Sequence, residues 1–323
     1  MRSALICPDS FKGTFSAPEV CEAIASGVRA AGMSAVEMPV ADGGEGTLAV
    51  LLRDGGTRLE AQVRGPLGEP VEASFGLLAG GRVAVVEMAQ ASGLELVPPE
   101  SRDAWRASTE GTGELIAAAA AQGPERVLVS VGGSATTDGG RGAVEALRMA
   151  GPLPPLTVLC DVETRFEDAA RVFGPQKGAD EAMVARLSRR LEEFAATLPR
   201  DPRGTPRTGC AGGLSGGLWA QFGAELVSGA DFVLEVCGFD RALEASDLVV
   251  TGEGCLDSQS YAGKIVSAIT SRSAAAGVPC CAVVGRSALS EGEAAGLGLE
   301  RVLEATDASA QRQAGFELAS EYS

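Results

Sequence analysis

The spacing of hydrophobic residues changes along the chain and separates its two ends from its middle. At the start, apolar residues first form a short continuous run, then recur four residues apart, and then form a run again. A short run predicts a strand, and the wider spacing predicts a helix. We therefore expect alternating strands and helices at residues 4–7, 16–32, 36–40 and 47–53.

The middle of the chain begins with a different pattern, because apolar residues alternate with polar or small ones from Leu59 onward. A period of two is typical of half-buried strands, and turns rich in glycine and proline separate the runs. We expect an antiparallel meander of strands at 59–63, 71–75 and 83–85. Beyond it the pattern predicts helices at 113–122, 142–149 and 180–196 and strands at 126–131 and 156–160.

The last third of the chain returns to buried apolar runs separated by helices. It follows a polar linker at 201–208 and a glycine-rich segment at 209–217, and it predicts strands at 232–236, 248–251 and 280–284 and helices at 240–245 and 263–276. Because the two ends share this pattern, the predicted fold class is α/β with two domains. We expect residues 1–58 and 238–323 to form a doubly wound, Rossmann-like parallel sheet and residues 59–237 to form an inserted mixed α/β domain.

Charge and composition narrow the classes of function. The net charge of −16 leaves no basic stripe for a nucleic-acid backbone, so we expect no nucleic-acid partner. The sequence has no histidine, which excludes a Ser-His-Asp mechanism and leaves carboxylates or lysine to transfer protons. Any metal is then expected to be a hard, oxygen-bound ion such as Mg²⁺. No apolar run is long enough for a signal peptide or a membrane span, and no CxxC pair occurs, so we expect a cytoplasmic protein without a membrane partner.

Lysine is rare in this sequence and always lies next to glycine. Only Lys12, Lys177 and Lys264 are lysines among the 27 basic residues. A mobile ammonium group beside exposed backbone N–H groups is a combination that holds phosphate. Chance adjacency is the alternative, because 43 of the 323 residues are glycine.

Acidic residues follow the predicted strands. In an open α/β sheet, ligands collect outside the carboxyl ends of the strands, so the residues after each strand carry most weight. One Asp-Gly loop is typical of a simple turn, but carboxylates that converge near lysines and glycine-rich loops are what phosphoryl transfer uses. The loops are 8–14, 41–47, 132–140, 161–163 and 251–257.

The common nucleotide-binding motifs do not occur in the sequence. Residues 258–265 end like a Walker A loop. However, Ser258 replaces the first glycine of that motif, and Ile265 replaces its Ser/Thr residue. Residues 252–254 begin a dinucleotide fingerprint that Asp257 breaks. The pattern therefore disfavours a P-loop NTPase, an ordinary NAD enzyme and a protein kinase.

Five longer motifs cover nearly the whole chain in one order. They are CPDSFKG at 7–13, PVADGGEGT at 39–47, GGSATTDGG at 132–140, VFGPQKG at 172–178 and TGEGCLD at 251–257. Together they resemble the bacterial glycerate kinases of the first type. The resemblance implies ATP-dependent phosphorylation of D-glycerate, usually at the 2-hydroxyl, and a two-domain α/β fold with the site between the domains. The sequence departs from the family's pattern at Thr137, at Cys255, in a shorter stretch between Leu147 and Leu156, and after Val284.

The resemblance and the acidic loops together give candidate roles to individual residues. We expect Asp42 or Asp161 to take the hydroxyl proton, with Lys12 as a further catalytic residue. Candidate Mg²⁺ ligands are Asp138, Glu253 and Asp257, and candidate glycerate-binding residues are Ser10, Lys177 and Arg141. Candidate nucleotide and phosphate contacts are Gly133, Ser134, Lys264, Gly252 and Gly254. For each carboxylate, turn or cap bonding is the alternative role.

Other readings of the sequence stay open. The expected partners are D-glycerate and ATP, with Mg²⁺ as cofactor, and a homodimer is one option for the assembly. The alternatives are a kinase that gives 3-phosphoglycerate, a kinase of another small hydroxy acid or polyol, and a sensor that binds an acid and a nucleotide without turnover. Residues 209–217 are expected to form an anion-binding nest, with a hinge as the alternative.

Overall fold

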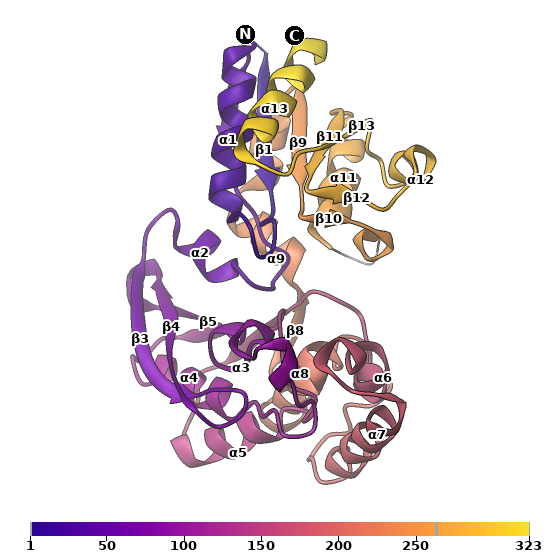
Figure 1. Cartoon of the computed structure of the whole chain (residues 1–323). Helices are drawn as coiled ribbons and strands as arrows, with labels where there is room; N and C mark the ends of the chain where they lie inside the picture. The colour runs from indigo at the N-terminus through magenta and orange to yellow at the C-terminus, as the bar shows by residue number, and fades with distance from the viewer. Residues whose placement is uncertain (1, 262–263, 323) are drawn as a thin grey trace. The chain divides into compact units, whose positions relative to one another are not determined.

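The computed structural model of the chain describes residues 2–261 and 264–322. The chain divides into two compact units (Figure 1). Unit 1 consists of Met1–Asp42 and Ala230–Ser323, and unit 2 consists of Gly43–Gly229. Each unit combines helices with its own β-sheet, so the α/β prediction is confirmed.

Unit 1 is built on a parallel sheet whose strands come from both ends of the chain. The strands are β1 (Ser3–Pro8), β2 (Ser34–Glu37), β9 (Leu248–Gly252), β11 (Cys280–Val284) and β13 (Arg301–Glu304). Their order is β13-β11-β9-β1-β2. β1 pairs with β2 on one side and with β9 on the other, so the strand order reverses at β1. This reversal is the topological switch point of a doubly wound sheet, as predicted.

Two helices from opposite ends of the chain lie side by side on one face of this sheet. They are α1 (Ala17–Ala30) and α13 (Ala308–Tyr322) (Figure 1). Val20, Ile24 and Val28 of α1, which share a helix face in the sequence pattern, are fully buried against β1, β9 and β11. A Cβ atom on Gly315 would lie 2.3 Å from the Ile24 carbonyl oxygen, so only glycine permits this helix contact.

The remaining elements of unit 1 are short. They comprise helices α9 (Gly229–Val236), α10 (Phe239–Glu244), α11 (Ile265–Ala276) and α12 (Glu291–Gly296), a 3-10 helix η6 (Ser258–Tyr261) and a parallel pair of two-residue strands, β10 (Cys255–Leu256) and β12 (Arg286–Ser287). α11 packs against β9 and β11. The predicted start of this helix at Gly263 lies outside the described residues. No helix in the described part of the chain combines the length and apolarity that crossing a bilayer requires.

Unit 2 contains the predicted mixed sheet. Its strands are β3 (Thr57–Arg64), β4 (Pro70–Leu78), β5 (Val83–Glu87), β6 (Arg126–Ser130), β7 (Leu156–Cys160) and β8 (Glu225–Ser228), in that spatial order. β3 to β5 are antiparallel and β5 to β8 are parallel. The helices include α2 (Thr47–Leu52), α3 (Ala89–Ser92), α4 (Glu110–Ala120), α5 (Arg141–Ala150), α6 (Ala169–Phe173), α7 (Glu181–Ala195) and α8 (Cys210–Phe222).

Residues 232–236 were predicted as a strand, and this prediction is wrong because they belong to helix α9. Ala230, Val233 and Leu234 are buried while Val236 is 55% exposed, which is the three-and-four spacing of a helix face. A five-residue apolar run does not by itself distinguish a strand from a helix turn. The strand of this region comes earlier, as β8, which was not predicted.

The boundaries between the units fall earlier than the predicted ones after residues 58 and 237. The observed boundaries follow Asp42 and Gly229. Helix α2 packs against β4 and β5 and so belongs to unit 2. The buried Glu87 carboxylate at the end of β5 accepts hydrogen bonds from the N–H groups of Gly46 and Leu48, each at 3.1 Å. The sequence pattern carried no signal for this long-range anchor.

Candidate active site

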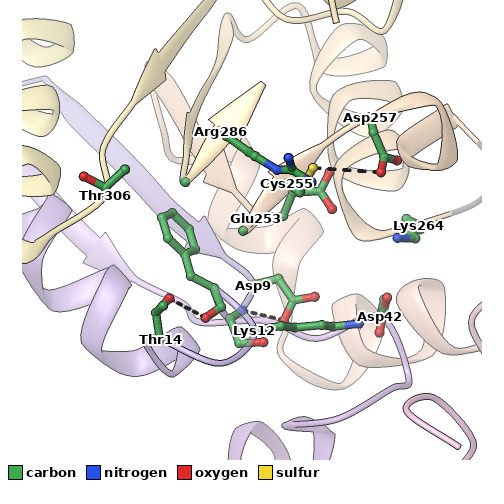
Figure 2. Close-up of a pocket in the computed structure, with 14 residues that line it drawn as sticks. Asp9, Lys12, Thr14, Asp42, Glu253, Cys255, Asp257, Lys264, Arg286 and Thr306 are labelled. Carbon is green, nitrogen blue, oxygen red and sulfur yellow. Dashed lines mark hydrogen bonds between the residues drawn. The ribbon is translucent and has the colours of Figure 1, made fainter. Parts of the chain in front are cut away.

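A cavity of about 530 Å³ opens in unit 1 outside the carboxyl ends of its strands (Figure 2). The loops after β1, β9, β11 and β13 all contribute to its lining, and they meet at one edge because these strands are parallel. Doubly wound sheets bind ligands at this edge, next to the switch point. The charged residues of the lining are Asp9, Lys12, Asp42, Glu253, Asp257, Lys264 and Arg286.

Backbone pairing brings Asp9 and Asp42 to the same edge of the sheet. Asp9 directly follows β1. After β2 ends, the chain stays beside β1, because the N–H groups of Met38 and Val40 donate to β1 carbonyl oxygens at 2.8 and 3.1 Å. This accounts for the predicted strand at 36–40, whose pairing continues beyond the observed end of β2. Asp9 is 6% exposed and Asp42 4% exposed, so both carboxyl groups line the cavity from buried positions.

The electrostatic environment favours the protonated form of Asp9. Burial raises the pKa of the Asp9 carboxyl well above its ordinary value, and the charges of Asp42 and Glu253 raise it further. The Ser10 N–H group, which donates to Asp9 Oδ1 at 2.6 Å, and the charge of Lys12 act in the opposite direction. Figure 2 shows the Lys12 side chain directed toward Asp42. A buried acid next to a second carboxylate is an arrangement suited to proton transfer.

Glu253 is the third buried carboxylate of the cavity and follows β9. It is 8% exposed, and its Oε1 accepts a hydrogen bond from the Ser260 hydroxyl at 2.5 Å. Burial raises the pKa of the Glu253 carboxyl, and the nearby charges of Asp42 and Asp257 raise it as well. The Ser260 hydrogen bond and the Lys264 ammonium group lower it. The Glu253 side chain is therefore held in one orientation at the cavity wall.

Two cations complete the lining on the side of α11 and β12. Lys264 is the N-cap residue of α11, so its ammonium group adds to the positive end of that helix. Arg286 begins β12 and pairs in register with Cys255 of β10. Unpaired N–H groups at a helix start, together with lysine and arginine side chains, form a favourable environment for phosphate.

Unit 2 holds a second polar cluster, centred on Lys177. This side chain is 2% exposed, and its Nζ donates to Ser134 Oγ at 2.8 Å and to the Thr136 carbonyl oxygen at 2.5 Å. Burial lowers the pKa of Lys177 from 10.5 to about 7, although the charges of Asp138 and Asp161 act to raise it. Lys177 thus fixes the loop after β6 and carries a charge that changes near neutral pH.

Asp138 has a bonding pattern that disfavours the predicted metal role. Its carboxylate accepts hydrogen bonds from the N–H and hydroxyl groups of Thr109, at 2.9 and 2.8 Å, and from the N–H groups of Gly140 and Gly142, at 3.0 and 3.2 Å. Four donors fill most of the acceptor sites of a carboxylate. The Asp138 side chain therefore anchors the start of α5, where a negative charge is favourable.

The remaining predicted residues of unit 2 lie around this loop. Arg141 is the first residue of α5, and its guanidinium lies 4.9 Å from the centre of the Phe194 ring. Asp161 directly follows β7, and Gly133 adopts a φ of 72°, which glycine tolerates. The predicted site residues thus divide between the units. Unit 1 holds Ser10, Lys12, Asp42, Gly252, Glu253, Gly254, Asp257 and Lys264, and unit 2 holds Gly133, Ser134, Asp138, Arg141, Asp161 and Lys177.

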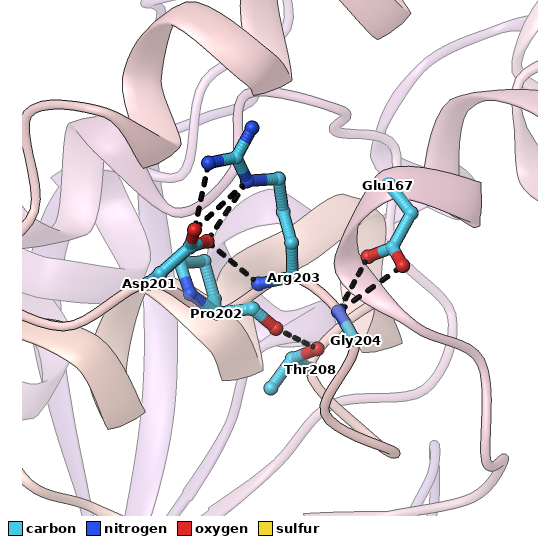
Figure 3. A network of polar contacts seen from close by, with 6 residues as sticks. All are labelled: Glu167, Asp201, Pro202, Arg203, Gly204 and Thr208. Atoms are coloured by element: carbon cyan, nitrogen blue, oxygen red, sulfur yellow. Dashed lines mark hydrogen bonds and ion pairs between the residues drawn. The ribbon is translucent and has the colours of Figure 1, made fainter.

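The predicted polar linker at 201–208 is an ordered loop that precedes α8 (Figure 3). Arg203 pairs with Asp201 at 2.6 Å, and the Gly204 N–H group donates to the Glu167 carboxylate. The Thr208 hydroxyl donates to the Pro202 carbonyl oxygen at 2.9 Å. These bonds fix the start of the glycine-rich segment 209–217.

That segment begins α8 with three successive residues of positive φ, at 211 to 213. Such a run turns backbone N–H groups toward one side, as in an anion-binding nest. Gly212 packs so closely on the loop after β6 that a Cβ atom there would lie 2.0 Å from the Thr136 carbonyl oxygen. The nest and hinge readings of this segment both stay predictions.

The acids of the cavity suit a metal that arrives with a phosphate ligand. Among residues 2–261 and 264–322, no group of three or more His, Cys, Asp or Glu side chains is placed to hold a metal ion. Mg²⁺ usually takes one or two protein carboxylates together with phosphate oxygens and water. Glu253 and Asp257 offer hard oxygen donors at the cavity wall, so the residues present fit that mode of binding.

Several cavity residues were not among the predicted site residues. Asp9, Phe11 and Thr14 come from the loop after β1, whereas Arg286 and Thr306 each stand two residues after a strand. The rule that ligands collect after parallel strands could have found Arg286, because residues 280–284 were already predicted as a strand. β13 was not predicted, so Thr306 had no strand to follow.

Comparison with known protein families decides the class of chemistry. A sequence model of the glycerate kinase family matches residues 4–151 and 154–322. The chain belongs to the glycerate kinase family. The family resemblance and the prediction of a kinase are thereby confirmed. The interruption at 152–153 falls between α5 and β7, within the stretch that is shorter than the family's pattern.

Individual members of the glycerate kinase family are similar over most of their length. The chain is 40% identical over 301 aligned residues to the glycerate 2-kinase of Escherichia coli (strain K12), covering 81% of this chain and 79% of that protein. It is 37% identical to the glycerate kinase of Bacillus subtilis (strain 168), covering 98% and 94%. A crystal structure named as that of a glycerate kinase 2 from Salmonella typhimurium LT2 has a TM-score of 0.82 at 32% identity, covering 99% and 98%.

Proposed function

We propose that this member of the glycerate kinase family transfers the terminal phosphoryl group of ATP to the 2-hydroxyl of D-glycerate and gives 2-phosphoglycerate and ADP. The observation that carries the proposal is the cavity at the switch point of unit 1, where buried carboxyl groups and cations meet. Phosphoryl transfer needs a carboxylate to take the hydroxyl proton and positive groups to balance the phosphate charge. The charged lining supplies both kinds of group.

Asp42 is the proposed base. It lies in the cavity beside Asp9, whose raised pKa, caused by burial and then by the charge of Asp42, favours its protonated form. Asp42 then faces the protonated carboxyl group of Asp9, and Asp42 is the member of the pair proposed to accept the substrate proton. As the glycerate oxygen bonds to the terminal phosphorus, its proton passes to the Asp42 carboxylate and the bond to ADP breaks. Asp161 of unit 2 is the second candidate, because it follows β7 and contributes to the charge around Lys177.

The proposed phosphate contacts lie along the loops after β1 and β9. Lys12 and Lys264 supply positive charge, and the start of α11 supplies a helix N-terminus. Gly254, which lines the cavity, and Gly252, the last residue of β9, remain candidate phosphate contacts through their backbone groups. In unit 2, Gly133 and Ser134 remain candidate phosphate contacts, and Lys177, Arg141 and the unit 1 residue Ser10 remain candidate contacts for the glycerate carboxylate.

Mg²⁺ is the proposed cofactor, held by Glu253 and Asp257 together with the phosphates of ATP. When bound, it neutralises charge on the phosphate oxygens. Ser260 orients Glu253 through its hydrogen bond at 2.5 Å, which leaves the second carboxylate oxygen of Glu253 for this task.

The proposed position of phosphorylation follows the name of the Escherichia coli relative, a glycerate 2-kinase. A kinase that gives 3-phosphoglycerate or acts on another small hydroxy acid is the alternative. The test is ADP formation by the purified protein with ATP, Mg²⁺ and D-glycerate, with L-glycerate, glycerol and no acceptor as controls. Turnover that depends on D-glycerate supports the proposal. Equal turnover with all acceptors, or none with any of them, would contradict it.

A further inference from the structure

Arg286 is one of the cations that line the cavity. In residues 2–261 and 264–322, its guanidinium has no hydrogen-bond or ion-pair partner. Two other arginines of unit 1 pair with carboxylates: Arg272 with two aspartates and Arg301 with two glutamates. Arg286 lines the cavity instead, so its five donors are available to a ligand (Figure 2).

The backbone around Arg286 is fixed by the end of β9. The Gly285 N–H group donates to the Glu253 carbonyl oxygen and the Arg286 N–H group donates to the Gly254 carbonyl oxygen, each at 3.2 Å. A Cβ atom on Gly285 would lie 2.6 Å from the Gly254 carbonyl oxygen, so glycine is needed for this close contact. The two loops are thereby held together, and Arg286 stands in register with Cys255.

We propose that the Arg286 guanidinium binds the phosphate chain of the nucleoside triphosphate. This inference rests on the proposed function and names a phosphate contact of the same site. A guanidinium offers a planar fork of donors that fits two phosphate oxygens at once. Lys264 lies at the start of α11 and Arg286 at the start of β12, so the cavity has cations on two different elements. An elongated polyanion can contact both cations.

The charge of the cavity is consistent with this assignment. Its lining carries four carboxyl groups against the cations Lys12, Lys264 and Arg286. Glu253 and Asp257 repel an anion unless positive charge lies next to them, and Arg286 belongs to the strand that pairs with their loop. Removal of Arg286 is therefore expected to weaken binding of the triphosphate far more than binding of a nucleoside monophosphate.

The test compares Arg286→Ala with Arg241→Ala, which removes an exposed arginine on α10 of the same unit away from the cavity lining. Binding of a non-hydrolysable ATP analogue and of AMP is measured by calorimetry, and the KM values for ATP and D-glycerate are measured in turnover. We expect Arg286→Ala to weaken analogue binding and raise the KM for ATP by about 10- to 100-fold. AMP binding, the KM for D-glycerate and all Arg241→Ala values are expected to stay within about twofold.

A second variant returns the guanidinium to the cavity from the paired strand. Because Cys255 lines the cavity and pairs with Arg286, the double variant Cys255→Arg with Arg286→Ala is expected to recover most of the affinity for the analogue. A double variant that keeps the wild-type Tm but recovers no affinity would overturn the assignment. So would an Arg286→Ala variant that binds the analogue normally or raises only the KM for D-glycerate. The calorimetry needs no turnover, so it distinguishes failure of this inference from failure of the proposed reaction.

Discussion

Asp9 lies beside Asp42 in a buried position. Burial raises the pKa of the Asp9 carboxyl well above its ordinary value, and the charge of Asp42 is the next largest cause. The two residues are separated in sequence by α1 and β2 and meet because the chain after β2 remains hydrogen-bonded to β1. A pair of this kind costs stability, because two carboxyl groups in one buried place resist ionisation. Such a cost is typical of sites shaped for chemistry.

Replacement of Asp42 by Asn removes the proposed base while keeping the size of the side chain. We expect Asp42→Asn to lower kcat by about 10²- to 10⁴-fold, the usual contribution of a positioned general base. Circular dichroism and Tm are expected to show a folded protein. The matched variant is Asp161→Asn in unit 2. If Asp161→Asn loses this turnover and Asp42→Asn retains it, Asp161 is the base and the assignment to Asp42 is wrong.

Replacement of Asp9 by Asn is expected to stabilise the protein at neutral pH. The folded pKa of Asp9 is raised above its unfolded value, so the folded state binds this proton more tightly. The free energy of unfolding therefore falls as pH rises from the unfolded pKa through the folded one. Asparagine cannot ionise, so the Asp9→Asn variant should have a higher Tm than wild type at neutral pH and lose this advantage as pH falls toward 4. A Tm below that of wild type at every pH contradicts the argument.

Lys177 is expected to make the free energy of unfolding rise with pH above neutrality, in the direction opposite to the effect of Asp9. Burial lowers its pKa from 10.5 to about 7, so between these values the unfolded state binds more protons than the folded state. As pH rises through this window, the wild type should therefore gain up to about 1.4 kcal/mol of unfolding free energy per pH unit relative to Lys177→Met. Below pH 7 the difference between the two proteins should be constant. Denaturant unfolding at several pH values tests this, and parallel curves from pH 7 to 10 would refute it.

Gly252, the last residue of β9, is expected to be indispensable for the packing of β9 against β11. A Cβ atom at this position would lie 2.0 Å from the Val283 carbonyl oxygen, and backbone atoms of β11 cannot move aside cheaply. We expect Gly252→Ala to cost about 3 kcal/mol or more of unfolding free energy. The control is Gly292→Ala in α12, where no atom lies within 4 Å of the added Cβ, and there we expect no loss or a gain of up to about 1 kcal/mol. Equal effects of the two substitutions would contradict the packing at β9.

Local patterns predicted the elements that carry strong periodicity. The buried positions Val20, Ile24 and Val28 and the meander of β3 to β5 were read correctly, because one face of each element is apolar. Residues 232–236 were misread, because a short apolar run satisfies a strand and a helix equally. α13 was missed because its polar and small residues show no strong apolar stripe, and it is buried against α1 through Gly315 instead.

The sequence predicted which loops form the candidate site but not how their side chains are arranged in space. The acids after β1, β2 and β9 were located because the strands themselves were recognised. The raised pKa of Asp9, the four donors around Asp138 and the burial of Lys177 depend on contacts between segments far apart in the chain. Sequence spacing holds no information about such contacts. Arg286 was overlooked because its loop falls where the family resemblance weakens, although it follows a predicted strand.

The most direct test of the account is the phosphorus NMR spectrum of the product made from ATP, Mg²⁺ and D-glycerate. The wild-type protein is expected to give 2-phosphoglycerate, whose phosphorus couples to the single proton on C2 and appears as a doublet. Asp42→Asn is expected to give no such signal above background in the same time. A triplet, which reports 3-phosphoglycerate through its two C3 protons, would overturn the proposed position of transfer. The absence of any new phosphate ester from D-glycerate would contradict the proposed reaction itself.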